Sequence, residues 1–142
     1  MCIVQESDIM EYLVKTRSKQ TKKFIEAILP SMISQLGLER SRKFLLIDVC
    51  RLESEKGLTT PLPGLDSIVI ALNPAKWQDL GVTLAHEMVH VKQLAKGTLR
   101  AVGGDKWWRG KKYSRRTKYL DMPWEIDAFA QQEIIFRRAL ED

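Results

Sequence analysis

The two histidines of the sequence, His86 and His90, stand four residues apart with Glu87 between them, in the pattern HExxH. Residues four apart lie on one face of an α-helix, one turn from each other, so both imidazoles can reach a single ion. A glutamate beside them can act as a base toward a water molecule that such an ion polarises. The spacing therefore predicts a helix that binds a metal ion.

A complete metal site needs a further ligand from elsewhere in the chain. A catalytic zinc ion takes three protein ligands and keeps a fourth position for water. Since the chain has no third histidine, the ligand must be a carboxylate or a cysteine, and we favour Glu125, which opens a second predicted helix. An acid at this position could instead interact only with the helix dipole. Asp127 is the rival ligand, or it accepts an N–H from a ligating histidine.

The residues around the histidines predict a long central helix. Apolar residues recur with a helical period from Trp77 to Lys96, and Gly97 ends the run. They fall on most sides of the helix, which is typical of a helix buried in the middle of a protein. A later helix is predicted from Pro123 to Ala139, with proline in its first turn and an inward face made of Ile126, Phe129, Ala130, Ile134 and Ala139.

The chain before the histidine helix predicts helical structure followed by a small sheet. Residues from about Ser7 to Leu36 have a helical apolar period, and Pro30 inside it marks either a kink or the junction of two helices. Two apolar runs, Lys43–Leu52 and Asp66–Asn73, predict strands. The residues between them, Glu53–Leu65, contain two glycines and two prolines and predict a loop.

A basic segment separates the two predicted ligand helices. From Lys96 to Lys118 nine lysines and arginines, interleaved with tryptophans and tyrosines, are opposed only by Asp105. Within it, Thr98–Tyr113 has a glycine turn and predicts a hairpin. Such a segment can bind nucleic acid or an acidic protein partner. It can also be a solvated hairpin whose aromatic side chains cover the core.

Length and composition bound the class of protein. The chain has 142 residues, a net charge of +5, 44% hydrophobic and 29% charged residues, which is typical of one globular domain. No apolar run approaches the roughly 18 residues of a membrane span, the N-terminus lacks a secretory signal, and Cys2 and Cys50 form no disulfide framework. We expect a single α+β domain over residues 1–142, in the cytoplasm. Its parts are N-terminal helices, a small sheet, the central HExxH helix and a C-terminal glutamate helix.

The stretch from Leu72 to Ala130 resembles the gluzincins, zinc peptidases in which HExxH supplies two ligands and a glutamate on a later helix supplies the third. In several of these families an alanine follows the ligand glutamate by three residues, as Ala128 follows Glu125. The compact form is similar to small SprT-like and ImmA-like domains of bacteria and phages. Gluzincins often have Asp or Asn where this chain has Phe129, and SprT-like proteins take a third histidine as ligand.

The resemblance implies a zincin-like fold and a monomeric peptidase that acts on peptide or protein substrates. Zinc held by His86, His90 and Glu125 would activate a water molecule, and Glu87 would act as the general base. The main alternative is a zinc-stabilised, non-catalytic module that uses residues 96–118 to hold nucleic acid or a protein partner. An intact Glu87 argues against that alternative, because a purely structural zinc site has no use for a base.

Two further parts of the site follow from the same chemistry. The oxyanion needs a donor besides the metal, and Tyr119 and Tyr113 are the candidates, with Arg115 or Arg116 behind them. A substrate peptide could add to an exposed strand edge, for which we expect Ile68–Leu72.

Overall fold

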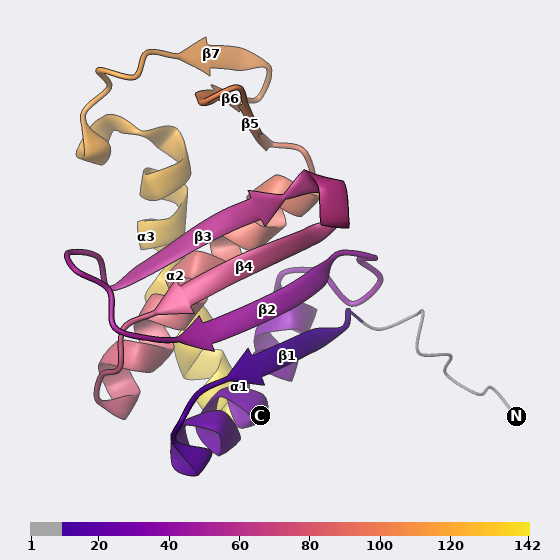
Figure 1. Cartoon of the computed structure of the whole chain (residues 1–142), viewed down its shortest axis with the longest axis vertical. Helices are drawn as coiled ribbons and strands as arrows, with labels where there is room; N and C mark the ends of the chain where they lie inside the picture. Colours follow the sequence, from indigo (N-terminus) through magenta and orange to yellow (C-terminus); the bar gives the residue numbers. More distant parts are fainter. Residues whose placement is uncertain (1–9) are drawn as a thin grey trace, which may run out of the picture.

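The computed structural model describes residues 10–142 as an α+β fold with three α-helices and two small sheets. The larger sheet, in the order β1-β2-β4-β3, consists of β1 (Tyr12–Lys15), β2 (Phe44–Val49), β3 (Gly57–Leu62) and β4 (Ser67–Leu72). The smaller sheet is antiparallel and consists of β5 (Leu99–Val102), β6 (Asp105–Trp108) and β7 (Lys111–Tyr113). The helices are α1 (Lys19–Gln35), α2 (Trp77–Ala95) and α3 (Pro123–Glu141), and the short 3₁₀ helix η3 (Tyr119–Asp121) precedes α3 (Figure 1).

The three helices lie on one face of the larger sheet, and the core lies between them and the strands (Figure 1). Strands β1, β2 and β4 are parallel, and Leu45 and Ile47 of β2 stand beside Ile68 and Ile70 of β4. All four side chains are buried, as is Met88 of α2. Because alternate residues of a strand face the same side, the apolar residues of each strand form one stripe that packs against the helices.

The N-terminal helix is shorter than predicted. Residues 12–15 form strand β1, which pairs in parallel with Leu45–Asp48, and α1 begins only at Lys19, where the Ser18 hydroxyl accepts a hydrogen bond from Thr21 N. The prediction was wrong because local periodicity does not record pairing with a strand about thirty residues away. Its first residues, 7–9, lie outside the described residues. Pro30 lies within the single helix α1.

The predicted loop at Glu53–Leu65 was also wrong in part, since it contains strand β3. Glycine and proline made these residues resemble a loop, but β3 is an edge strand, where proline is tolerated because one side of the backbone needs no partner. Strand β4 is therefore an interior strand with neighbours on both sides. The free edge predicted for Ile68–Leu72 belongs instead to β3.

Helix α3 has the predicted position but a different inward face. Ile126, Phe129 and Ile134 are 54%, 45% and 53% exposed, whereas the buried residues are Trp124, Glu125, Ala128, Ile135, Phe136 and Ala139. The predicted face was wrong except at Ala139. The true face carries a glutamate near its start, so a search for apolar periodicity favours the neighbouring stripe.

The strands at residues 44–49 and 67–72, helix α2, the glycine turn between β5 and β6, and the bounds of α3 confirm the predictions. Helices α2 and α3 approach closely at Gly81, where a Cβ atom would stand 2.0 Å from Phe136 Cε1. This contact brings the histidine helix against the glutamate helix. Among residues 10–142 no helix is long and apolar enough to cross a bilayer. Cys50 is a free thiol, and Cys2 lies outside the described residues.

Candidate metal centre

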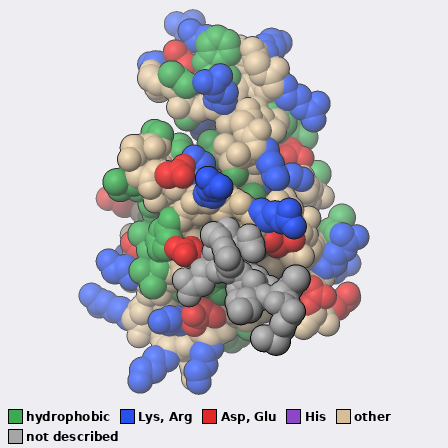
Figure 2. Space-filling model, turned by 90° about the vertical axis from the view of Figure 1, so that its right-hand side faces the viewer, with side chains coloured by type: hydrophobic (Ala, Val, Ile, Leu, Met, Phe, Trp, Pro, Cys, Tyr) green, Lys and Arg blue, Asp and Glu red, His purple; other side chains and the backbone are tan. Residues whose placement is uncertain are grey.

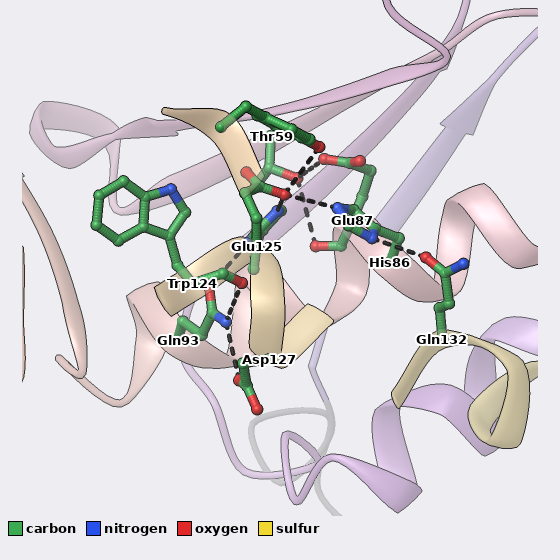
Figure 3. A network of polar contacts seen from close by, with 10 residues as sticks. Thr59, His86, Glu87, Gln93, Trp124, Glu125, Asp127 and Gln132 are labelled. Carbon is green, nitrogen blue, oxygen red and sulfur yellow. Dashed lines mark hydrogen bonds and ion pairs between the residues drawn. The ribbon is translucent and has the colours of Figure 1, made fainter. Parts of the chain in front are cut away.

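The side chains of the HExxH pattern meet Glu125 between α2 and α3 (Figure 3). Glu125 Oε1 lies 2.8 Å from His86 Nε2 and 3.1 Å from His90 Nε2. All three side chains are buried. The Tyr119 hydroxyl donates a hydrogen bond of 3.1 Å to the same oxygen. One carboxylate oxygen is thus the meeting point of both imidazoles.

A buried glutamine fixes the proton position on His90. Gln93 Nε2 donates to Trp124 O and to Asp127 Oδ2, both at 2.9 Å. Since two acceptors hold the amide nitrogen, the amide oxygen faces His90 Nδ1, at 2.8 Å. An amide oxygen can only accept, so Nδ1 carries the hydrogen and Nε2 is left to face Glu125.

His86 has the same arrangement with a glutamine from the other helix. Gln132 Oε1 of α3 lies 2.8 Å from His86 Nδ1. With hydrogens on both Nδ1 atoms, the neutral imidazoles turn the lone pairs of their Nε2 atoms toward the carboxylate oxygen of Glu125. Three electron-rich atoms this close together repel one another unless a cation lies among them. A partner that fixes the outer nitrogen is the usual companion of a metal-ligating histidine.

The donor set therefore fits a metal ion. Bonds of about 2.1 Å at tetrahedral angles separate neighbouring donor atoms by about 3.4 Å, so separations of 2.8 and 3.1 Å need to widen only slightly. His86, Glu87 and His90 also offer ligand atoms within 4.8 Å of one another. Of the two carboxylates, Glu125 is the better ligand because both imidazoles contact it, whereas a threonine holds Glu87.

The ionisation of the centre also favours a cation. Burial would raise the pKa of Glu125, but hydrogen bonds and charge from His86 and His90 hold it far below its usual range. Burial would lower the pKa of His90, but its hydrogen bonds to Glu125 and Gln93 leave it raised. Both shifts describe the centre with a proton on Nε2 that is donated to Glu125, in the place where a metal ion would otherwise lie, so positive charge is stabilised between the imidazoles and the carboxylate.

Glu87 is positioned by the edge strand β3. The hydroxyl of Thr59 donates a hydrogen bond of 2.8 Å to Glu87 Oε1. A Cβ atom on Gly57 would stand 2.9 Å from Thr83 Cγ2 and 3.0 Å from Glu87 Cγ, so only glycine lets the strand lie this close to the glutamate. Burial raises the pKa of Glu87 despite the opposing effects of His90 and Thr59.

The remaining predicted residues divide into those at the centre and those away from it. Tyr119 is at the centre, whereas Tyr113 packs edge-on against Trp124, with ring centroids 5.6 Å apart. Asp127 accepts hydrogen bonds from Gln93 and Gln131 and makes no hydrogen bond to a histidine.

Arginine does not reach the centre. Arg115 forms an ion pair of 3.1 Å with Asp105 and donates to Gly103 O. Arg116 is exposed, and its backbone N–H donates a hydrogen bond to the Ser114 hydroxyl. Among the described residues neither arginine forms a hydrogen bond to Tyr119, and the oxyanion role considered for them stays a prediction.

Sequence reasoning missed the residues that orient the site, namely Thr59, Gln93 and Gln132. The two glutamines did leave a signal. Gln93 follows His90 by three residues and Gln132 follows Glu125 by seven, so each lies on the same helix face as a ligand. Thr59 left none, because its strand was predicted as a loop.

A groove passes through the centre along β3. It consists of two cavities of about 290 and 360 Å³ that share Glu55, Gly57, His86, Glu87 and Tyr119. The first, which we call the sheet half, is further lined by Thr59, Pro61, Leu99, Ala101, Lys106 and Trp124. The second, the helix half, is further lined by Ser54, Lys56, Val82, Thr83, Phe129 and Gln132. In Figure 3, Trp124 and Gln132 lie on opposite sides of the centre, in keeping with this division.

Comparison of the chain with models of protein families, with curated proteins and with solved structures gives no match. The resemblance to gluzincins therefore rests on the motif residues and their spacing alone. What the centre does has to be argued from its own geometry.

Proposed function

We propose that the protein is a zinc-dependent metallopeptidase. The observation that carries the proposal is the meeting of His86 Nε2, His90 Nε2 and Glu125 Oε1, with the outer nitrogen of each histidine held by a glutamine oxygen. Two imidazoles and one carboxylate suit zinc, and three protein ligands with an open position are typical of a catalytic rather than a structural site. The free thiol of Cys50 supports a cytoplasmic setting.

The chain's own residues supply the rest of the chemistry. When bound, zinc would acidify a water molecule and polarise the peptide carbonyl. Glu87, held at one oxygen by Thr59, takes the proton from the attacking water and passes it to the leaving amine. Burial and the charge of Glu125 raise the pKa of Tyr119, so its hydroxyl remains a donor. Being half-exposed, Tyr119 can turn from Glu125 toward the oxyanion of the tetrahedral intermediate.

The groove supports an extended peptide as the substrate. Strand β3 runs along it, and one edge of β3 has no neighbouring strand among residues 10–142. A peptide can pair with such an edge through main-chain hydrogen bonds, which hold the substrate without demanding particular side chains. The peptide bond to be cleaved would then lie over Glu87, which β3 contacts through Gly57 and Thr59.

A second candidate is a zinc-stabilised module that binds nucleic acid or a protein through residues 96–118. The exposed cations of β5–β7 favour it. Two features argue against it. Glu87 is buried at the centre although His86, His90 and Glu125 could bind the metal without it, and a groove extends on both sides of the centre. We therefore keep peptide hydrolysis as the conclusion.

Metal analysis combined with a cleavage assay tests the proposal. Purified wild type, His86→Ala and Glu87→Gln would be analysed for bound metals and incubated with a complex peptide mixture that is read by mass spectrometry. We expect about one zinc per chain in wild type and in Glu87→Gln, and much less in His86→Ala. We expect new peptide ends only with wild type, since loss of a general base typically lowers turnover by about 10²- to 10⁴-fold.

Each result separates the candidates. Zinc in wild type and Glu87→Gln with no cleavage by wild type would leave the binding module as the better conclusion. Wild type without zinc, even after incubation with zinc and dialysis, would overturn both. Equal cleavage by wild type and Glu87→Gln would remove the assigned mechanism.

A further inference from the structure

We infer that the groove selects peptides with an acidic side chain on the N-terminal side of the cleaved bond and an apolar side chain on its C-terminal side. Lys106 is the residue that recognises the acid, and Phe129 is the residue that receives the apolar side chain. The inference rests on the proposed peptidase function and adds the substrate class to it. It follows from the difference between the two halves of the groove.

The sheet half contains a lysine without an acidic partner. Lys106 belongs to β6 and lies opposite Ala101 and Tyr113 of the neighbouring strands, on the face of the small sheet that turns to the groove. Its Nζ lies 5.3 Å from the ring centroid of Trp124, and it forms no ion pair with a carboxylate of residues 10–142. The acid next to it, Asp105, is already paired with Lys112 and Arg115.

The same half contains an unmatched donor. Trp124, which lines it, has a buried indole N–H with no acceptor among the described residues. Because this N–H is closed off from solvent, Trp124 offers the groove its ring, over which the Lys106 ammonium lies. The ammonium is the group that fits a carboxylate, since a hydrogen bond between two charged groups is the stronger kind.

The positive charge of the small sheet also favours an acidic substrate. Strands β5–β7 and the residues that flank them hold nine cations against Asp105. Figure 2 shows several Lys and Arg side chains on the lobe that these strands form at the top of the molecule, as well as on the rest of this face. A surface of one sign next to a groove raises the local concentration of oppositely charged ligands.

The helix half differs in character. The Phe129 ring packs edge-on against His86, with centroids 4.6 Å apart, yet the side chain is 45% exposed and lines the cavity together with Val82. Lys56 and Glu55 both line this half, so it carries charges of both signs. An exposed aromatic ring and a valine fit an apolar side chain of the substrate.

The direction of β3 determines which end of the substrate lies in which half of the groove. The residues before Gly57 line the helix half, and Thr59 and Pro61 line the sheet half. Antiparallel pairing is the more stable mode of adding a strand to an edge. A peptide that runs antiparallel to β3 places its N-terminal part at Thr59 and Pro61, beside Lys106, and its C-terminal part beside Phe129.

Matched quenched-fluorescent peptides test the inference. They differ only in Glu or Gln on the N-terminal side of the cleaved bond, and in Leu or Ser on its C-terminal side. We expect wild type to favour Glu over Gln by about tenfold in kcat/KM, as a charge-assisted contact allows. Lys106→Met should bring that ratio close to one, and Lys106→Glu should invert it. Phe129→Ala should reduce the preference for Leu over Ser.

Two control variants match these changes. Lys112→Met removes a lysine from the adjacent strand on the opposite face of the small sheet. Ile126→Ala removes an exposed apolar side chain from α3 that lines neither half of the groove. Neither should alter the ratios. The zinc content of all variants should equal that of wild type.

Binding separates failure of the inference from failure of the proposed function. Fluorescence anisotropy with Glu87→Gln measures affinity for the same peptides without cleavage, and it should show the same preference for Glu and its loss in the double variant with Lys106→Met. Preferential binding without any cleavage by wild type would keep the selectivity and overturn the peptidase. Cleavage with equal rates for Glu and Gln, or with the acid favoured only on the C-terminal side, would overturn the inference.

Discussion

The metal centre and the β5–β7 sheet use polar residues in opposite ways. At the centre, His86, His90 and Glu125 are buried, and each histidine nitrogen has a partner. On the sheet, cations far outnumber acids and most of them are exposed. The main hydrophobic core includes no residue of β5–β7. The polar groups of the centre are thus held by one another, whereas those of the sheet mostly face solvent.

This difference separates the two tasks of the proposed enzyme. A buried polar group that loses its partner destabilises the protein strongly, so the geometry of the centre is resistant to change. Exposed pairs such as Asp105 with Arg115 contribute little and are weakened by salt. Changes at the sheet should therefore alter which substrate is cleaved, and changes at the centre should alter whether any is cleaved.

Removal of the metal should have the largest effect. In the proposed site, ligands from α2 and α3 would be joined by one ion, so folding and zinc binding should be coupled. At zinc about 1,000-fold above its dissociation constant the stabilisation is about 4 kcal/mol, which corresponds to a melting temperature higher by on the order of 10 °C. Calorimetry with chelator, and again after zinc is restored, measures it. An unchanged melt after verified removal would show that the centre does not hold the helices together.

Substitution of Gln93 should come next, because it acts on the ligands through their orientation. Gln93→Ala removes the acceptor of His90 Nδ1 and leaves Trp124 O and Asp127 with one donor fewer. Loss of such a partner typically lowers metal affinity about 10- to 100-fold. Competition with a chromophoric chelator gives the number. Gln131→Ala is the matched control, since Gln131 contacts Asp127 but no histidine, and an equal loss there would assign the effect to Asp127.

The sequence predicted those parts of the centre that depend on neighbouring residues, and missed those that depend on contacts between distant ones. HExxH and the apolar period of α2 are local, and the helix has nearly the predicted bounds. The ligand role given to Glu125 stays a prediction, although the structure brings the residue between the histidines. Strand β3 escaped prediction because its composition is that of a loop and its pairing with β4 is non-local.

The same limit explains why the selectivity residues were not singled out. Nine cations in one segment look equivalent in sequence, but the register of β5, β6 and β7 turns Lys106 to the groove and Lys112 to the opposite face. Register is set by turns and by packing against distant residues rather than by composition. Phe129 was predicted to face inward, but it is exposed because the buried stripe of α3 passes through Glu125 instead.

A change at the contact between α2 and α3 shows how far the centre depends on packing alone. Gly81→Ala places a methyl group against the Phe136 ring, where the space is already filled. Overpacking of this kind destabilises a protein by about 1–3 kcal/mol, and pushing the helices apart should also weaken zinc binding. Thermal melts with and without zinc measure both effects. The paired variant Gly81→Ala with Phe136→Leu should recover part of the loss, and no recovery would place the cause elsewhere.

Charge reversal on the sheet should have the smallest effect and the most selective one. Arg115→Glu with Arg116→Glu changes the charge of the segment without touching the groove lining or the ligands. Because distant exposed charges act mainly on the rate of encounter, cleavage of an acidic peptide should slow a few-fold at low salt. The difference should vanish at high salt, where such charges are screened, and zinc content should stay constant. A different result would favour the binding module: tight binding of DNA or RNA by wild type, falling steeply with salt and lost on this reversal.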